Sequence, residues 1–286
     1  MKKGCLIFAH NNRQIDYSLL ALISGGLAKK NLKVPISLVT DKSTVDWMHE
    51  FGSLPKAKEI FENIIIVDRP VTNNTRKLSD GMESSTVPFI NSNRHSVWEL
   101  TPYDRTLLLD SDFLIFSDNL GQYWDVDESL LISHSMNDIK GDRVGELDKN
   151  VSETGIHMYW ATTVMFTKNS ETKLFFDLVD HIKINYKYYS DLYRFNPLQF
   201  RNDIAFSVAK HILNGYRETD NICLPPINTV IDKDILCDVS NDKLTFLIND
   251  LLNQEKYIAA ASKNRDIHIM NKQSIIRNSK KLLELL

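Results

Sequence analysis

The chain has 286 residues, of which 43% are hydrophobic and 25% charged, a balance typical of a folded globular protein with a sizeable core. Its formal net charge is −3, so no overall positive field favours nucleic acid or an anionic membrane as a partner. Cys5, Cys223 and Cys237 form no CxxC pair, which excludes a zinc ribbon and a disulfide framework. No apolar run is long enough to span a membrane, and the run near the start is too short for a signal peptide. We therefore expect a cytoplasmic protein.

The first part of the chain predicts alternating strands and helices. A strand over residues 4–9 is followed by a helix over residues 15–31 and a second strand over residues 34–41. Two strands joined by a helix predict a right-handed parallel crossover, and ligands of such sheets bind beyond the carboxyl ends of the strands. His10, Asn11 and Asp41 are therefore expected at the binding edge. The turn after the first strand lacks GxGxxG, which disfavours a dinucleotide site.

The next segments lead to the middle of the chain. Residues 63–68 form a continuous apolar run and predict a fully buried strand. Residues 69–93 are polar and poorly periodic, so we expect a long functional or mobile loop. Residues 93–104 predict a short helix that stops near Pro102 and leads into a further strand.

Later elements alternate in the same way, without a repeat or a linker. Helix 171–189 should bury Leu174, Leu178, Ile182 and Tyr186 on one face. A helix over residues 202–213 should begin with an Asn-Asp cap. The other expected elements are strands at 130–135, 158–167, 227–231 and 266–270, a charged loop at 137–153 and a terminal helix at 273–286. The pattern predicts one α/β domain.

Two carboxylates one residue apart, Asp110 and Asp112, separate two apolar runs in "TLLLDSDFLIF". Buried together without compensation, two anions repel each other and are costly to desolvate. A divalent cation such as Mg²⁺ or Mn²⁺ removes both costs, because hard ions bind carboxylate oxygens and keep open positions for phosphate. The alternative is that Asp-Ser-Asp caps a β-turn.

The surrounding block, "NRHSVWELTPYDRTLLLDSDFLIFSDNLGQYW" (residues 93–124), resembles the central block of glycogenin-type and galactosyltransferase-like enzymes. These are nucleotide-sugar glycosyltransferases of the GT-A fold. In that family a basic residue four before a Trp, then Leu-Thr-x-Tyr and an apolar strand, leads into DxD. Arg94, Trp98, Tyr103 and the Asp110-Ser111-Asp112 triplet fill these positions, and a looser similarity of element order runs from Gly4 to about Lys272.

The resemblance implies a fold and a division of labour along the chain. The fold would be a Rossmann-like, mixed but mainly parallel sheet flanked by helices, in one continuous domain over residues 1–286. Residues 1–120 would form the nucleotide-sugar-binding half, and residues 121–286 the acceptor-binding half with the C-terminal helix.

The resemblance also implies a metal site. Mn²⁺ (or Mg²⁺) would be held by Asp110, Asp112 and a His on a late strand, which "DIHIM" supplies as His268. A His in an apolar strand can equally be a satisfied core residue. The Gly and Lys-Pro-Trp that follow this His in the family are absent here, and Lys272 is the nearest cation for the diphosphate.

Two residues are candidates for catalytic roles. Arg94 stands where the family has a Lys, and its guanidinium could hold the diphosphate bidentately and stabilise the leaving charge. The family's acidic residue at a helix start corresponds to Asp203, whose alternative role is to cap that helix with Asn202. The family's Asn-x-Gly strand has become "WATTV", with Ala161 at the Asn position, so Thr162 or Thr163 would replace the usual sugar contact.

The implied activity is that of a metal-dependent hexosyltransferase that moves a sugar from a nucleoside diphosphate, most simply UDP, to an acceptor hydroxyl with retention. If the enzyme inverts, Asp203 is the candidate base. Arg76 and Lys77 would close over the phosphates as a lid, or form a solvated loop pair. The substrate-binding residues expected are Ala9, His10, Asn11, Asp41, Arg76, Trp98, Ser111, Thr162, Asn202 and Lys272.

Two rival functions remain. A nucleotidyltransferase would need a glycine-rich loop after the first strand, which "AHNNRQ" lacks. A catalytically inactive nucleotide-sugar-binding protein stays open because of the altered "WATTV". The acceptor is not specified and could be a glycan, a protein or another hydroxyl compound. Nucleic acid and a membrane span are not indicated, and a homodimer is compatible with the sequence.

Overall fold

The computed structural model describes residues 1–12, 14–71, 73–81, 83–141, 149–153, 155–217, 222–240, 243–250 and 256–286. Much of the expected charged loop, residues 142–148, lies outside this range. The strands are β1 (Lys3–Phe8), β2 (Ile36–Asp41), β3 (Asn63–Val67), β4 (Thr75–Asp80), β5 (Glu83–Pro88), β6 (Arg105–Leu109), β7 (Phe113–Leu114), β8 (Leu130–Ser133), β9 (Met136–Asp138), β10 (Trp160–Thr167), β11 (Ile227–Val230), β12 (Ile235–Ser240), β13 (Lys243–Asn249), β14 (Tyr257–Lys263) and β15 (Ile267–Ile269). The helices are α1 (Tyr17–Leu32), α2 (Lys42–Glu50), α3 (Leu54–Ile60), α4 (Val97–Leu100), α5 (Ser170–Ile184), α6 (Tyr186–Tyr193), α7 (Asn202–Leu213), α8 (Lys272–Arg277) and α9 (Ser279–Glu284), with 3₁₀ turns η1 (Arg94–Ser96) and η2 (Asn119–Asp125).

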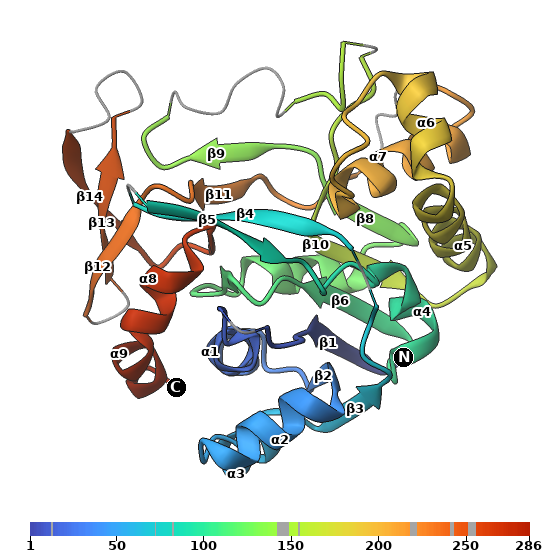
Figure 1. Ribbon diagram of the computed structural model, residues 1–286. Coiled ribbons are helices and arrows are strands. Elements are labelled where there is room, and N and C mark those ends of the chain that lie inside the picture. The colour runs from blue at the N-terminus through green and yellow to red at the C-terminus, as the bar shows by residue number, and fades with distance from the viewer. Residues whose placement is uncertain are drawn as a thin grey trace.

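A six-stranded sheet of order β3-β2-β1-β6-β10-β8 forms the centre of the molecule (Figure 1). The pairs β3–β2, β2–β1 and β1–β6 are parallel, whereas β6–β10 and β10–β8 are antiparallel. The expected mixed, mainly parallel sheet flanked by helices is therefore confirmed. The chain leaves β1 for β2 on one side and later returns to β6 on the other. This reversal of strand order opens a crevice at the carboxyl ends of β1 and β6.

Burial along these strands follows their position in the sheet. β2 and β6 have neighbours on both sides, and all their residues are buried. β3 was predicted to be fully buried, and this is wrong. It pairs only with β2, its residues are mostly half-buried, and Ile66 is 54% exposed. An edge strand covered on one side explains the difference.

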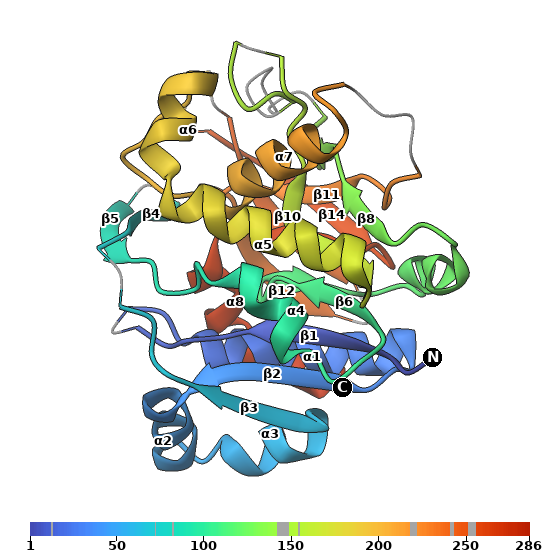
Figure 2. The same ribbon diagram turned by 90° about the vertical axis from the view of Figure 1, so that its right-hand side faces the viewer.

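Helices cover both faces of the central sheet. α1 packs against β1, β2 and β7, while α7 packs against β10 and α5. Figure 2 shows α4 and α5 in front of the central sheet and α1 behind it. α1 begins where the Asp16 side chain accepts a hydrogen bond from the N–H of Leu19, which is the cap that a helix start requires. Among the described residues, no helix combines the length and apolar character that crossing a membrane requires.

A second sheet, of order β7-β15-β11-β9, meets the first at the Asp-Ser-Asp segment. The chain leaves the central sheet after Leu109 and enters the second sheet at Phe113. β15 runs antiparallel to β7, with His268 opposite Phe113. The pairing therefore brings His268 next to the two aspartates, although the chain between them is more than 150 residues long.

The polar segment 69–93 contains a β-hairpin rather than only a loop. β4 and β5 pair antiparallel from Thr75–Pro88 to Asp80–Glu83. Most β5 side chains are exposed, so the segment lacks the alternation of apolar and polar residues that would have indicated strands. A further antiparallel sheet, β12-β13-β14, was also not expected.

Three helix predictions need correction. The expected helix 171–189 is two helices divided at Asn185, and it buries Phe175, Phe176 and Val179, whereas Leu174 is 56% exposed. The terminal helix is likewise divided at Asn278.

The third correction concerns the start of α7. Arg201 occupies the N-cap without a side-chain hydrogen bond to the helix, and Asn202 and Asp203 lie in the first turn. The predicted Asn-Asp cap is therefore wrong, and both side chains are available for other contacts.

Candidate active site

The Asp-Ser-Asp segment is held at the seam between the two sheets. The N–H of Asp110 donates to the carbonyl of Thr162 on β10 (3.0 Å), and the carbonyl of Asp112 accepts from the N–H of Ile269 on β15 (3.0 Å). From α1, the Ser24 hydroxyl lies within hydrogen-bond reach of the carbonyls of Asp110 (3.3 Å) and Phe113 (2.8 Å). These bonds hold the bend from both sides. The two apolar runs are therefore strands of two different sheets, and Asp110 and Asp112 lie in the bend that connects them.

The side chains of Asp110, Asp112 and His268 form a cluster in which one ligand atom from each lies within 4.8 Å of the others. His268 Nε2 is 3.4 Å from Asp112 Oδ1. His268 Nδ1 is buried and has no hydrogen-bond partner in the part of the chain that the structure describes. Two carboxylates and an imidazole at this spacing fit a Mn²⁺ or Mg²⁺ ion.

Each aspartate of the cluster also has a cationic partner. Arg94 pairs with Asp110, and the Lys272 ammonium donates to Asp112. Burial alone would raise the pKa of Asp112, but the charges of Lys272 and His268 outweigh it and hold this pKa well below its usual range. Burial lowers the pKa of Lys272, and the charge of Asp112 opposes that effect. The cluster is thus closely balanced in charge.

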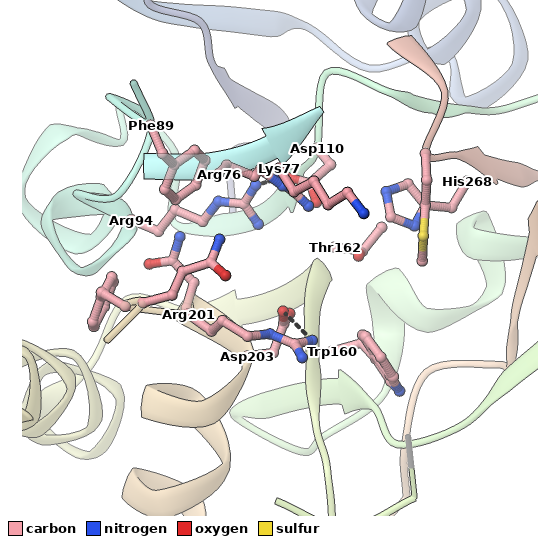
Figure 3. A pocket seen from close by; sticks show the side chains of 14 residues that line it. Arg76, Lys77, Phe89, Arg94, Asp110, Trp160, Thr162, Arg201, Asp203 and His268 are labelled. Carbon is pink, nitrogen blue, oxygen red and sulfur yellow. Dashed lines mark hydrogen bonds and ion pairs between the residues drawn. The ribbon is translucent and has the colours of Figure 1, made fainter. Parts of the chain in front are cut away.

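A cavity of about 330 Å³ opens beside the cluster (Figure 3). Figure 3 shows Arg76, Arg94 and Asp110 along one side and Arg201, Asp203 and Trp160 along the other. Its further lining includes Lys77, Phe89, Thr162, Phe200, Asn202 and His268. A cavity that combines aromatic rings with several cations suits a ligand that carries both a ring and phosphate groups.

The strand "WATTV" connects the two sides of the cavity through its backbone. The Ala161 N–H donates to Asp203 Oδ1 (2.8 Å), and the Ala161 carbonyl accepts from Arg94 Nη1 (2.6 Å). Arg201 Nη2 lies 3.3 Å from Asp203 Oδ2. Since these bonds use only the backbone of Ala161, the side chain lost at this position does not disturb the placement of Arg94 and Asp203.

Two buried polar atoms at the cavity have no partner among the described residues. These atoms are Trp160 Nε1 and Asn202 Oδ1. Both residues line the cavity and are almost fully buried. Asn202 Oδ1 can accept a hydrogen bond, so it suits a hydroxyl group of a bound ligand, whereas the Trp160 indole nitrogen points away from Arg94 and Asp110 (Figure 3).

The expected nucleoside edge lies at the ends of β1 and β2. His10 Nδ1 is 2.9 Å from Asp41 Oδ2, and Arg69 Nη1 lies 3.1 Å from the same oxygen. Asp41 also caps α2 by accepting from the N–H of Thr44 (3.1 Å). Ala9, His10, Asn11 and Asp41 are buried and lie outside the lining of the cavity.

Sequence reasoning missed three residues at or near the site. Arg69 donates to the Asn11 carbonyl (2.6 Å) as well as to Asp41, and Arg201 and Trp160 line the cavity. A cation directly after the third strand was the available signal for Arg69. The direction in which the other two side chains point depends on the packing of α7 and β10.

Trp98 and Ser111, two further expected substrate-binding residues, also lie outside the cavity lining. Trp98 donates from Nε1 to Thr172 Oγ1 (3.2 Å), and Lys168 and Lys173 lie over its ring. Ser111 is buried in the bend between the aspartates and is not part of the lining. The structure therefore brings together Arg76, Arg94, Asp110, Thr162, Asn202, Asp203 and His268 around the cavity, with Asp112 and Lys272 directly behind.

No protein-family model and no curated protein matches the chain. Solved structures of several glycosyltransferases match it. The glycosyltransferase GlyE of Streptococcus pneumoniae TIGR4 has 13% identity and a TM-score of 0.42, over 74% of this chain and 43% of that chain. The galactosyltransferase LgtC has 14% identity and a TM-score of 0.42, over 72% and 70%. Mouse xyloside xylosyltransferase 1 has 9% identity and a TM-score of 0.41, over 76% and 83%.

Proposed function

We propose that this protein is a metal-dependent glycosyltransferase of the GT-A type, which moves a hexose from a nucleoside diphosphate, most simply UDP, to an acceptor hydroxyl with retention. The observation that carries this proposal is the gathering of Asp110, Asp112 and His268 beside a cation-lined cavity. This cluster lies at the point where the strand order reverses, which is where α/β sheets bind their ligands.

Asp110, Asp112 and His268 would hold a Mn²⁺ or Mg²⁺ ion, which supplies Lewis-acid stabilisation of the diphosphate charge. Arg94 and Lys272 would bind the departing phosphate and stabilise the charge that develops on it. Arg76 and Lys77 of β4 line the same cavity, and no carboxylate among the described residues pairs with either of them. They therefore have free positive charge to offer to the diphosphate.

The opposite wall would bind the sugars. Asn202 Oδ1 has no hydrogen-bond partner among the described residues, so it would accept a hydrogen bond from a sugar hydroxyl. Asp203 would orient the donor sugar or the acceptor, because its carboxylate faces the cavity and is fixed by the N–H of Ala161. The nucleoside would approach the ends of β1 and β2. The buried, unpaired thiol of Cys5 fits a reducing, cytoplasmic setting.

Calorimetric titration with UDP, with and without Mn²⁺, tests the proposal. Wild-type protein should bind UDP in the presence of Mn²⁺ and lose most of this affinity without it. Asp112→Asn should abolish the metal-dependent part. Asp118→Asn, an exposed carboxylate close by in the chain, should retain it. A thermal melt shows that each variant is folded.

A donor-hydrolysis screen over UDP- and GDP-sugars would then identify the donor. UDP binding that does not depend on metal, or full sugar transfer by Asp112→Asn, would refute the proposal.

A further inference from the structure

Both carboxylates of the proposed metal site already carry an internal cation. Asp112 and Lys272 are 3% and 4% exposed and form a direct ion pair. Arg94 pairs with Asp110 in the same way, at partial burial. A divalent ion that enters the cluster must therefore displace or approach two positive side chains.

The fold holds Lys272 in this place. His268 lies on β15, and α8 begins at Lys272, directly after the strand. Asn271 anchors the turn between them. Its Oδ1 accepts from the N–H of Ser274 (3.0 Å), and its Nδ2 donates to the carbonyl of Asp234 (2.8 Å). The lysine stem thus starts from a fixed point, while its four-carbon chain can still swing.

The charges explain why neither the divalent ion alone nor the diphosphate alone should bind well. Within the Arg94–Asp110 and Lys272–Asp112 pairs, positive and negative charges balance. A divalent ion alone adds two positive charges to two largely buried, already balanced ion pairs. A diphosphate alone can reach Arg76 and Lys77, but it finds Arg94 and Lys272 occupied by carboxylates. Uncompensated charge is costly under burial. Together, the ion and the diphosphate restore the balance, because the ion takes the carboxylates and the diphosphate takes the released cations.

We propose that Lys272 is the resident counter-ion of the metal site, and that it moves from Asp112 to the diphosphate when a divalent ion and the nucleotide bind as a pair. This inference rests on the proposed function. Lys272 lines a small cavity of about 80 Å³, and Arg76, Lys77 and Met270 line both this cavity and the larger one. Lys272 and the cavity that would hold the diphosphate are thus neighbours across these three residues.

The exchange makes the two binding events mutually dependent. Each ligand should raise the affinity of the other by the same factor, because coupling between two sites is reciprocal. Lys272 is thus a positioning residue that suppresses the binding of metal alone. The Mn²⁺ affinity of the free protein should be low, although all three ligand side chains are in place.

The experiment measures Mn²⁺ binding by electron paramagnetic resonance, with and without UDP, in wild type and Lys272→Met. In wild type, UDP should tighten Mn²⁺ binding by about tenfold or more. In Lys272→Met, Mn²⁺ alone should bind about tenfold more tightly than in wild type, and the effect of UDP should shrink. Lys77→Met is the matched control. It lines the same cavity without a carboxylate partner among the described residues, so it should weaken UDP binding and leave the affinity for Mn²⁺ alone unchanged.

Several outcomes would overturn the inference. The inference fails if Mn²⁺ alone binds equally tightly to wild type and Lys272→Met, or if Lys77→Met shows the same gain in Mn²⁺ affinity. If Lys272→Met fails to fold without metal, Mn²⁺ should restore a cooperative thermal transition, because the ion replaces the ammonium beside Asp112. A variant that stays unfolded with Mn²⁺ refutes the exchange. If wild type with Mn²⁺ does not bind UDP, the proposed function fails, and the measurements with Mn²⁺ alone still decide whether Lys272 competes for the metal site.

Discussion

The stability of the β2–α2 junction should depend on the charge of Asp41. This carboxylate is 1% exposed and receives hydrogen bonds from Thr44 and His10, with Arg69 at 3.1 Å. Burial acts to raise its pKa, but hydrogen bonds from Ser43, His10 and Thr44 and the charge of Arg69 outweigh burial and lower the pKa from 3.8 to about 2. Such a shift corresponds to about 2 kcal/mol of folding free energy. Asp41→Asn should destabilise the protein at pH 7 by about this amount, since Asn can still cap the helix.

The sign of the pH dependence follows from the lowered pKa. Well above pH 3.8 the carboxylate is ionised in both the folded and the unfolded chain, and the full stabilisation is present. As the pH falls from 3.8 towards 2, the unfolded chain takes up the proton first, so the stabilisation is lost. About half of it should be gone by pH 3.

Urea unfolding of wild type, Asp41→Asn and Asp46→Asn tests this reasoning. Asp46 lies on the helix that Asp41 caps, but it is exposed and forms an i,i+4 ion pair with Lys42. Its substitution should change stability by less than about 0.5 kcal/mol. The difference in unfolding free energy between wild type and Asp41→Asn should become smaller as the pH is lowered. A difference below about 0.5 kcal/mol at pH 7, or one that does not change with pH, would show that Asp41 does not stabilise the protein through its charge.

Two further substitutions separate structural from functional roles. In Asp203→Asn the side chain can still accept a hydrogen bond from the Ala161 N–H, so stability should change little. The rate of sugar transfer should fall by about 100-fold at unchanged UDP affinity. An unchanged transfer rate would show that Asp203 has no role in the reaction. Gly4→Ala would place a Cβ 2.5 Å from the Tyr103 ring and should cost about 1–3 kcal/mol, whereas Gly121→Ala meets nothing within 4 Å. Thermal melts compare the two glycine variants, and equal melting temperatures would contradict the steric argument.

The core of the site could be predicted because its residues end apolar strands. A continuous apolar run predicts a buried strand, and polar residues at its carboxyl end predict a binding edge; Asp110 does follow directly after the fully buried β6. His268 could be placed on a strand, but the sequence does not show that this strand pairs with β7. Tyr103, which belongs to the block that resembles glycosyltransferases, packs against Gly4 and lies 2.7 Å from the hydroxyl of Ser37. Its role in the structure is to support β1 and β2.

Other parts of the fold could not be read from local patterns. The β4–β5 hairpin is mostly polar, and the arginine and lysine that it brings to the cavity, Arg76 and Lys77, looked like loop residues. Arg201 stands just outside a helix, and its direction depends on how α7 packs on β10. Side-chain direction at helix ends and hairpins depends on tertiary contacts, and one sequence does not reveal these.

The seam between the two sheets has a consequence for how the molecule opens. Asp110 belongs to the end of the central sheet, whereas Asp112 and His268 are fixed to the short β7–β15 pair of the second sheet. An ion bound to all three would fasten one sheet to the other. The amide protons of β7 and β15 should then exchange with deuterium more slowly in the loaded protein than in the free one, because opening of this pair must first release the ligand. Binding of the ion would thereby determine how long the second sheet stays in contact with the central sheet at this seam.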